Sequence, residues 1–151
     1  MNNSLKFSQI VTSDIDTLMP IENACHSHPW NEKTFASCIG NRYFGEKLLQ
    51  TKNVVGFYVG EIVIDEATLM DICVKPDEQG KGFGKLLLNQ FIQQAKNKGA
   101  LKIWLEVRAK NISAQMLYMN AGFIEINRRT GYYPSSSGFG YEDAIVMSLK
   151  I

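Results

Sequence analysis

Apolar residues recur along the chain at two different spacings, and each change of spacing marks a new element. Alternating or β-rich stretches predict strands at residues 6–11, 44–50, 54–64, 67–74, 102–107, 123–127 and 143–149. Apolar residues at three- and four-residue steps predict helices within residues 12–22, 31–39, 86–98 and 111–121. Pro20 is expected to bend or reset the first helix. Residues 128–142 are rich in Tyr, Ser and Gly and are expected to form a loop.

These elements follow the order β, α, α, β, β, β, α, β, α, β, β. Three strands joined by short turns, between residues 44 and 74, predict an antiparallel meander. A strand, a crossover helix and a strand follow, which favours parallel pairing of residues 67–74 with residues 102–107. Asn31 and Asn111 stand where a side-chain oxygen can cap a helix. The 151 residues are expected to form a single domain, residues 1–151, because this length is typical of one domain.

Composition and charge exclude several classes of protein. The formal net charge of +1 argues against a general nucleic-acid binder. No apolar run reaches the length of a membrane span, and the N-terminus lacks a signal-peptide pattern, so a cytoplasmic protein is expected. The sequence itself does not indicate an oligomer, and a monomer is expected.

Neither the cysteines nor the histidines have the spacing of a metal site. The three cysteines, Cys25, Cys38 and Cys73, fit a reducing compartment and are expected to be ordinary thiols. An acyl-cysteine role for Cys73 is disfavoured because no histidine lies near it in the sequence. His26 and His28 are two residues apart with no nearby carboxylate pair or cysteine partner, so solvated or hydrogen-bonding histidines are favoured and no metal is expected.

A glycine-rich segment at residues 79–85 connects the predicted strand 67–74 to the helix that follows. Glycines let the backbone turn tightly, and the positive end of the helix favours an anion such as a phosphate. The dinucleotide pattern G-x-G-x-x-G fails because Lys85 stands where its last glycine should be. The P-loop pattern fails because Leu86 follows Gly84-Lys85 in place of Ser or Thr. An ordinary glycine-rich turn remains an alternative for this segment.

The segment Gln79-Gly80-Lys81-Gly82-Phe83-Gly84 resembles the pyrophosphate loop of the GCN5-related N-acetyltransferases (GNAT family), which bind acetyl-CoA. The element order is also that of this family. Residues 104–111, Trp-Leu-Glu-Val-Arg-Ala-Lys-Asn, resemble the W-L-E-V-R-x-x-N run of N-terminal acetyltransferases, and the matches continue at Ala114, Leu117-Tyr118 and Gly122-Phe123. The subgroup that the chain resembles most is the bacterial ribosomal-protein-alanine N-acetyltransferases.

The resemblance implies an α/β (α+β) GNAT fold. Such a fold has a mixed, mostly antiparallel twisted sheet of about seven strands with four helices. Its two central strands are parallel and splayed around acetyl-CoA, the expected co-substrate. The implied reaction transfers the acetyl group to the N-terminal alanine of a small-subunit ribosomal protein, by direct attack in a ternary complex. Acetylation of a small amine or a lysine side chain is an alternative, and a non-catalytic acyl-CoA-binding module is another.

Two residues are candidates for the chemistry. The spacing alone favours a position on the solvated side of a strand for Glu106. For Tyr118, which shares a helix face with Ala114 and Leu117, it favours a place in the core. The resemblance implies that Glu106 is the general base, acting directly or through a water, and that Tyr118 is the general acid.

The resemblance also implies the binding residues. Those expected to contact the cofactor are Ile72, Cys73, Val74, Gln79, Gly80, Lys81, Gly82, Phe83, Gly84, Lys85 and Asn111. The Val74 N–H is a candidate oxyanion donor, and Arg108 is expected to form a surface ion pair.

The residues expected to contact the peptide are Trp30, Tyr132 and Tyr133. The chain departs from the family pattern nearby, where Gly131 precedes the tyrosine pair and Tyr141 replaces a basic residue. This departure concerns the choice of peptide more than the chemistry.

Overall fold

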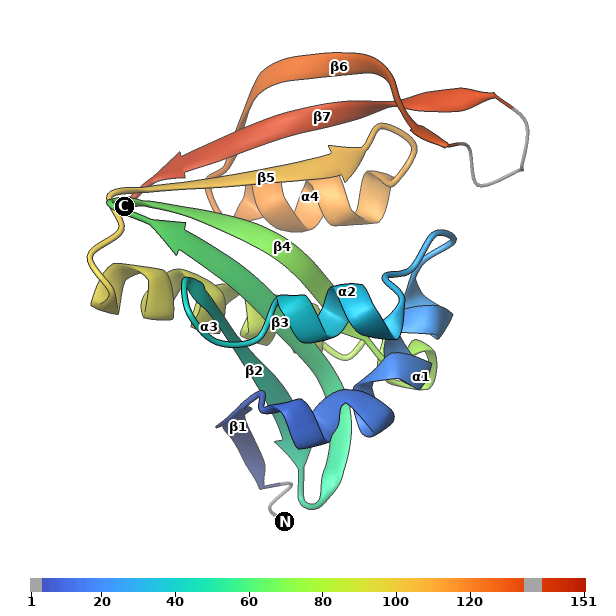
Figure 1. Ribbon diagram of the computed structural model, residues 1–151. Coiled ribbons are helices and arrows are strands. Elements are labelled where there is room, and N and C mark those ends of the chain that lie inside the picture. The colour runs from blue at the N-terminus through green and yellow to red at the C-terminus, as the bar shows by residue number, and fades with distance from the viewer. Residues whose placement is uncertain (1–3, 135–139) are drawn as a thin grey trace.

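The structure, a computed structural model, describes residues 4–134 and 140–151, and seven strands form one sheet within them (Figure 1). The strands are β1 (Leu5–Gln9), β2 (Tyr43–Gln50), β3 (Asn53–Val63), β4 (Glu66–Val74), β5 (Lys102–Arg108), β6 (Ile124–Pro134) and β7 (Tyr141–Lys150). Their order in the sheet is β1-β2-β3-β4-β5-β7-β6. β4 and β5 are parallel and the other neighbouring pairs are antiparallel. The predicted mixed sheet with a parallel central pair is confirmed.

In the described part of the chain, four α-helices accompany the sheet, and two short 3-10 turns precede two of them. The helices are α1 (Ile15–Cys25), α2 (Glu32–Ser37), α3 (Phe83–Asn97) and α4 (Ile112–Asn120), and the turns are η1 (Thr12–Asp14) and η2 (Pro76–Glu78). Both predicted caps are confirmed. Asn31 Oδ1 accepts the Thr34 N–H at 2.8 Å, and Asn111 Oδ1 accepts the Ala114 N–H at 3.2 Å. Within the described residues, no helix is both long and apolar enough to cross a membrane.

The helix α1 runs through Pro20 without interruption, so the prediction of a reset at this position was wrong. A proline inside a helix removes one backbone hydrogen bond. Leu18 and Ile21, on either side of Pro20, are buried against the sheet. Burial of these two side chains, at about 1.5–3 kcal/mol each, is large enough to offset the lost hydrogen bond.

The helices cover both faces of the sheet and divide the core into two parts. The helices α1 and α2 lie on one face and α3 lies on the other (Figure 1). On the α1/α2 face, Leu18, Phe35, Phe57 and Cys73 belong to one buried cluster. On the α3/α4 face, the buried cluster contains Ala67, Leu69, Leu87, Phe91, Ile103, Leu105, Val107 and Tyr118.

A β-bulge in β4 changes the face to which its side chains point. Val59 of β3 pairs with Asp71 and Gly60 pairs with Leu69, so Met70 is an extra residue in β4. Because one extra residue reverses the alternation of a strand, Leu69 packs on the α3 side while Cys73 packs on the α1 side. The bulge therefore turns the end of β4 towards α1.

The strands β4 and β5 pair only over their first residues. The parallel ladder joins Glu66–Thr68 to residues 102–104 and goes no further. Beyond it the strands diverge (Figure 1), as expected where a bulge bends one of them. In β5 the buried residues Leu105 and Val107 belong to the α3/α4 core. Because side chains alternate along a strand, Glu106 lies on the opposite face, which is the face that α1 and α2 cover.

The loop predicted for residues 128–142 was wrong over most of its length. The strand β6 continues to Pro134, and β7 begins at Tyr141. The register shifts between Arg129 and Tyr133, where Gly131 adopts a φ of 62° and its N–H donates to Asp143 Oδ1 at 3.0 Å. Glycine tolerates this left-handed conformation, so it forms a bulge inside the hairpin instead of ending the strand. Residues 135–139, the centre of the predicted loop, lie outside the described residues.

Candidate active site

A cavity of about 730 Å³ lies where β4 and β5 diverge. It is lined by most of the residues that the sequence singled out: Trp30, Ile72, Cys73, Val74, Gln79, Gly80, Gly82, Phe83, Gly84, Lys85, Glu106, Asn111, Tyr118 and Tyr133. These residues come from the connection between α1 and α2, from β4, the glycine segment, β5, α4 with its N-cap residue, and β6. Lys81 and Tyr132 are not part of the lining.

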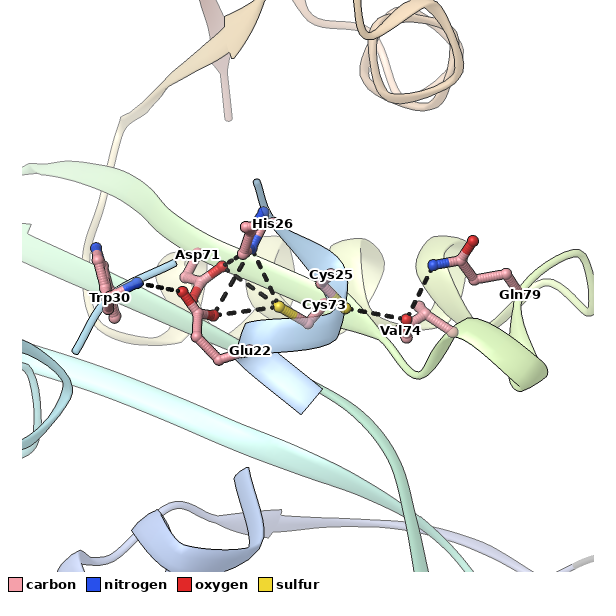
Figure 2. Close-up of polar contacts among 8 residues, drawn as sticks. All are labelled: Glu22, Cys25, His26, Trp30, Asp71, Cys73, Val74 and Gln79. Carbon is pink, nitrogen blue, oxygen red and sulfur yellow. Dashed lines mark hydrogen bonds and ion pairs between the residues drawn. The ribbon is translucent and has the colours of Figure 1, made fainter. Parts of the chain in front are cut away.

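The backbone of Val74 is directed into this cavity. The Lys75 N–H donates to the Val55 carbonyl of β3 at 2.8 Å. Because the backbone groups of an antiparallel strand alternate in direction, those of Val74 and Ile72 point away from β3, towards the gap beside β5. The Val74 carbonyl there accepts from Gln79 Nε2 at 3.1 Å and from Cys25 Sγ at 3.2 Å (Figure 2). By the same alternation, the backbone of Cys73 is turned towards β3.

The glycine segment leads into the N-terminus of α3, where backbone N–H groups and the helix dipole favour an anion. Gly80 and Gly82 have φ angles of 79° and 88°, which side chains rarely adopt. Gly82 is the N-cap residue of α3 and offers no side-chain cap, so the N–H groups of the first helical turn stay accessible to a ligand. Lys85 lines the cavity beside them. Lys81 instead forms an ion pair with Glu78 at 2.9 Å on the surface.

Glu106 reaches the cavity with its carboxylate held on one side. Its Oε1 lies 3.4 Å from Nη2 of Arg129. Its Oε2 is buried and has no hydrogen-bond partner among the residues that the structure describes. A buried oxygen of this kind costs free energy unless another group uses it. The carboxylate is therefore oriented by Arg129 and can still accept a proton.

Tyr118 is part of the α3/α4 core, as its spacing predicted, and it also lines the cavity, while its role as general acid stays a prediction. It is 6% exposed, and its ring packs edge-on against Phe123 with the ring centroids 6.0 Å apart. Burial raises the pKa of its phenol, and the negative charge of Asp71 adds to this effect. The phenol therefore holds its proton throughout the neutral pH range.

Arg108 connects β5 to the β6–β7 hairpin. The sequence predicted only a surface ion pair for this residue, but it makes three kinds of contact with the hairpin. Its Nη1 donates to the Pro134 carbonyl at 2.6 Å and lies 3.8 Å from the buried carboxylate of Glu142. Its guanidinium also stacks over the Tyr133 ring at 4.5 Å. Burial raises the pKa of Tyr133 to about 12. Arg108 thus fixes Tyr133 at the edge of the cavity.

Tyr132 has a different position from its neighbour. Its side chain is 49% exposed and contacts Arg129, whose guanidinium lies 4.9 Å from the ring centroid. Its ring packs edge-on against the Tyr133 ring, with the ring centroids 5.1 Å apart, so the two tyrosines lie side by side and Tyr133 alone of the two lines the cavity.

A buried polar cluster on the α1 side of the cavity was missed by sequence reasoning. His26 Nε2 lies 2.8 Å from Asp71 Oδ1 and 3.2 Å from Cys73 Sγ, and Glu22 Oε1 lies 3.4 Å from the same sulfur (Figure 2). Glu22 Oε2 accepts the Trp30 N–H at 2.9 Å. The reason given for excluding a role for the histidines was therefore wrong, because carboxylates and a cysteine do surround His26.

Two groups of this cluster, the Glu22 carboxyl and the Cys73 thiol, have pKa values well above their ordinary values. Burial raises the pKa of Glu22 to about 8, and the neighbouring Asp71 adds to this effect. Burial and the adjacent carboxylates raise the pKa of the Cys73 thiol far above its ordinary value. The thiol is therefore protonated and is a poor nucleophile, in agreement with the expectation that Cys73 does not carry an acyl group. One signal was available in the sequence, since Asp71 is the single charged residue in the predicted strand 67–74.

The fold and this cavity are those of an acetyltransferase. Residues 15–123 match the Acetyltransferase (GNAT) family, and the chain belongs to this family.

The chain is similar over nearly its whole length to enzymes described as [ribosomal protein bS18]-alanine N-acetyltransferase. The enzyme of Escherichia coli strain K12 is 43% identical over 144 residues, which are 95% of this chain and 96% of that protein. The enzyme of Haemophilus influenzae is 45% identical over 141 residues, 93% of this chain and 95% of that protein. The crystal structure of the ribosomal-protein-S18-alanine N-acetyltransferase from Escherichia coli superposes with a TM-score of 0.93 at 42% identity. This match covers 98% of this chain and 94% of that one.

Proposed function

We propose that this protein transfers the acetyl group of acetyl-CoA to the N-terminal alanine of ribosomal protein bS18. The observation that carries the proposal is that Glu106 and Tyr118 line the same cavity as the anion site at the start of α3. Relatives that span the whole chain bear this activity in their names. The diphosphate of acetyl-CoA would lie on the N–H groups of Gly82 to Lys85, and its pantetheine arm would follow the backbone of Ile72 and Val74.

Glu106 is proposed to remove the proton from the attacking amine. An α-amine has a pKa of about 7.7–8.0, so a large fraction is protonated at neutral pH and cannot attack. The Oε2 of Glu106, buried without a partner in the described part of the chain, is the acceptor for this proton, directly or through one water. Arg129 holds the carboxylate while the proton moves.

The acetyl group then passes directly from sulfur to nitrogen. A C–N bond forms, and the Val74 N–H stabilises the oxyanion of the resulting tetrahedral intermediate. The nitrogen then loses its second proton to solvent by way of Glu106, which has released the first, and the C–S bond breaks. Tyr118 gives its proton to the departing thiolate, and solvent restores the proton to the phenolate. Because the cavity holds both reactants together, no covalent enzyme intermediate is needed.

A peptide assay tests the proposed acceptor. Purified protein is mixed with acetyl-CoA and a synthetic peptide that carries the first residues of bS18, starting with alanine. Release of CoA is followed with a thiol reagent, and mass spectrometry locates the acetyl group. We expect acetylation at the α-amine and none on the same peptide with a blocked N-terminus.

Further acceptors decide between the alternatives. A polyamine and a peptide with a blocked N-terminus and one free lysine test small-amine and lysine acetylation. Faster turnover of either one than of the alanine peptide would contradict the proposed acceptor. Binding of acetyl-CoA with no turnover of any acceptor would favour the acyl-CoA-binding module. A cytoplasmic location and a monomeric state remain predictions.

A further inference from the structure

We propose that Glu22, His26, Asp71 and Cys73 form a binding site for a divalent cation of the zinc type, on the α1 side of the cavity. Each residue contributes one ligand atom, and these atoms all lie within 4.8 Å of one another. Glu22 lies in the last turn of α1 and His26 directly follows that helix, while Asp71 and Cys73 lie in β4 beyond its bulge. Figure 2 shows the four side chains converging. The four residues do not include Glu106 or Tyr118, which are proposed to carry out the acetyl transfer.

Five of the six separations among the four ligand atoms can be compared with a tetrahedral zinc centre, and the sixth, between Glu22 and Asp71, is within 4.8 Å. Zinc bonds of 2.0–2.3 Å in tetrahedral geometry place neighbouring ligand atoms about 3.3–3.6 Å apart. Cys73 Sγ lies 3.4 Å from Glu22 Oε1, 3.2 Å from His26 Nε2 and 3.6 Å from Asp71 Oδ1. His26 Nε2 lies 3.7 Å from Glu22 Oε1. The His26–Asp71 separation of 2.8 Å is that of a hydrogen bond, which would lengthen by about 0.5 Å around the ion.

The types of donor also suit zinc. One thiol, one imidazole and two carboxylates form a mixed sulfur, nitrogen and oxygen set, which zinc accepts and calcium or magnesium does not. The ring nitrogen, the thiol and the carboxyl groups bind metal in their deprotonated forms, so binding passes the thiol proton, and any proton held by Glu22 or His26, to solvent.

The burial of the cluster points to a cation as well. Glu22, Asp71 and Cys73 are 1%, 8% and 2% exposed. The second carboxylate oxygen of Asp71, Oδ2, is buried and has no hydrogen-bond partner among residues 4–134 and 140–151. Two buried carboxylates beside one another repel unless a proton or a cation neutralises them. A dication bound to one oxygen of each carboxylate would supply that neutralisation.

The location of the site predicts an effect of bound zinc on the acetyl-transfer reaction. This expectation rests on the proposed function. The four residues line the same cavity as Glu106 and Tyr118. The ion would draw the four side chains together at the α1 side of the cavity, next to Trp30, whose N–H Glu22 accepts. Zinc is therefore expected to change the KM for the peptide and to leave the KM for acetyl-CoA nearly unchanged.

The test begins with metal binding, without any assay of activity. Protein treated with a chelator and kept reduced is titrated with Zn²⁺ against a chromophoric competitor, and separately with Co²⁺ as a spectroscopic probe. We expect one ion per chain and a thiolate-to-cobalt charge-transfer band. Cys73→Ser should remove the band and weaken zinc binding at least about 10-fold. Loss of a residue that only hydrogen-bonds to a metal ligand already costs this much, and loss of a ligand should cost no less. Cys38→Ser, a buried cysteine outside the cluster, is the matched control and should keep both.

Two results would overturn the proposal. The first is the absence of a thiolate-to-cobalt band when Co²⁺ is added to the wild-type protein. This measurement does not depend on the folding of any variant. The other is zinc binding of equal strength in wild type, Cys73→Ser and Asp71→Asn. Kinetics with and without Zn²⁺ then test the effect on the peptide KM, and reversal by a chelator is expected. Because binding is measured directly, its failure is distinguishable from a failure of the acetyltransferase proposal.

Discussion

Glu106 Oε1 lies 3.4 Å from Nη2 of Arg129, although the strands that carry them, β5 and β6, are separated in the sheet by β7. The long Arg129 side chain reaches across this intervening strand. The contact fixes one oxygen of the carboxylate and leaves the other, Oε2, buried beside the cavity. The proposed base is thus positioned by the same hairpin that carries Tyr133.

Replacement of Glu106 by Gln tests the proposed base. The amide keeps the size of the side chain but cannot take a proton. We expect kcat to fall about 10²–10⁴-fold, the usual contribution of a general base. The dissociation constant for acetyl-CoA, measured by calorimetry, should change little. Glu125→Gln, on the surface of β6, should retain wild-type kinetics, and a fully active Glu106→Gln enzyme would remove Glu106 from the mechanism.

Replacement of Tyr118 by Phe separates its two roles. The ring that packs against Phe123 remains, so the melting temperature should stay close to that of the wild type. The proton donor is lost, so kcat should fall about 10²-fold or more. Tyr141→Phe, which alters a tyrosine that is 71% exposed, serves as the control. Wild-type turnover in Tyr118→Phe would leave Tyr118 as a core residue alone.

Two glycines at opposite ends of α3 allow the proposed anion site to be tested with a variant and a matched control. Gly82 and Gly99 have φ angles of 88° and 93°, and a Cβ would meet no atom within 4 Å at either position. Alanine at each should therefore cost a similar amount of stability, about 1–2 kcal/mol, from the left-handed backbone. We expect Gly82→Ala to raise the KM for acetyl-CoA and Gly99→Ala to leave it unchanged. Equal values of KM in the two variants would argue against an anion site at the N-terminus of α3.

The raised pKa of Glu22 predicts how the stability of the fold depends on pH. A carboxyl whose pKa is higher in the folded protein than in the unfolded chain stabilises the fold fully below its unfolded pKa, near 4.5. This contribution is lost as the pH rises through the folded value of about 8. His26, whose pKa is raised by its contact with Asp71 despite burial, acts in the same direction. The free energy of unfolding should therefore decrease between pH 5 and 8 as these groups lose protons.

Glu22→Gln should flatten this decrease, because the amide reproduces the neutral carboxyl and can still accept the Trp30 N–H. Urea unfolding at a series of pH values, in the presence of a chelator, gives the measurement. Glu32→Gln, at an exposed position in α2, should keep the wild-type slope. If the slopes of wild type and Glu22→Gln agree, Glu22 is ionised in the folded protein at neutral pH.

Local features of the sequence determined most of the elements and part of the site. The caps at Asn31 and Asn111, the glycine segment and the alternation in β5 each depend on neighbours within a few residues. Such local rules are readable from spacing alone. The resemblance to the GNAT family added the roles of Glu106 and Tyr118, which the spacing by itself left open.

Tertiary structure decided what depends on contacts between distant residues. The bulge at Met70 turns the end of β4 towards α1, and the bulge at Gly131 extends β6 through residues that were predicted to be a loop. Glu22 and Cys73 are 51 residues apart in the sequence, yet their side chains meet. Neither residue signals the other locally, because burial and the resulting pKa shifts arise only when α1 packs on β4.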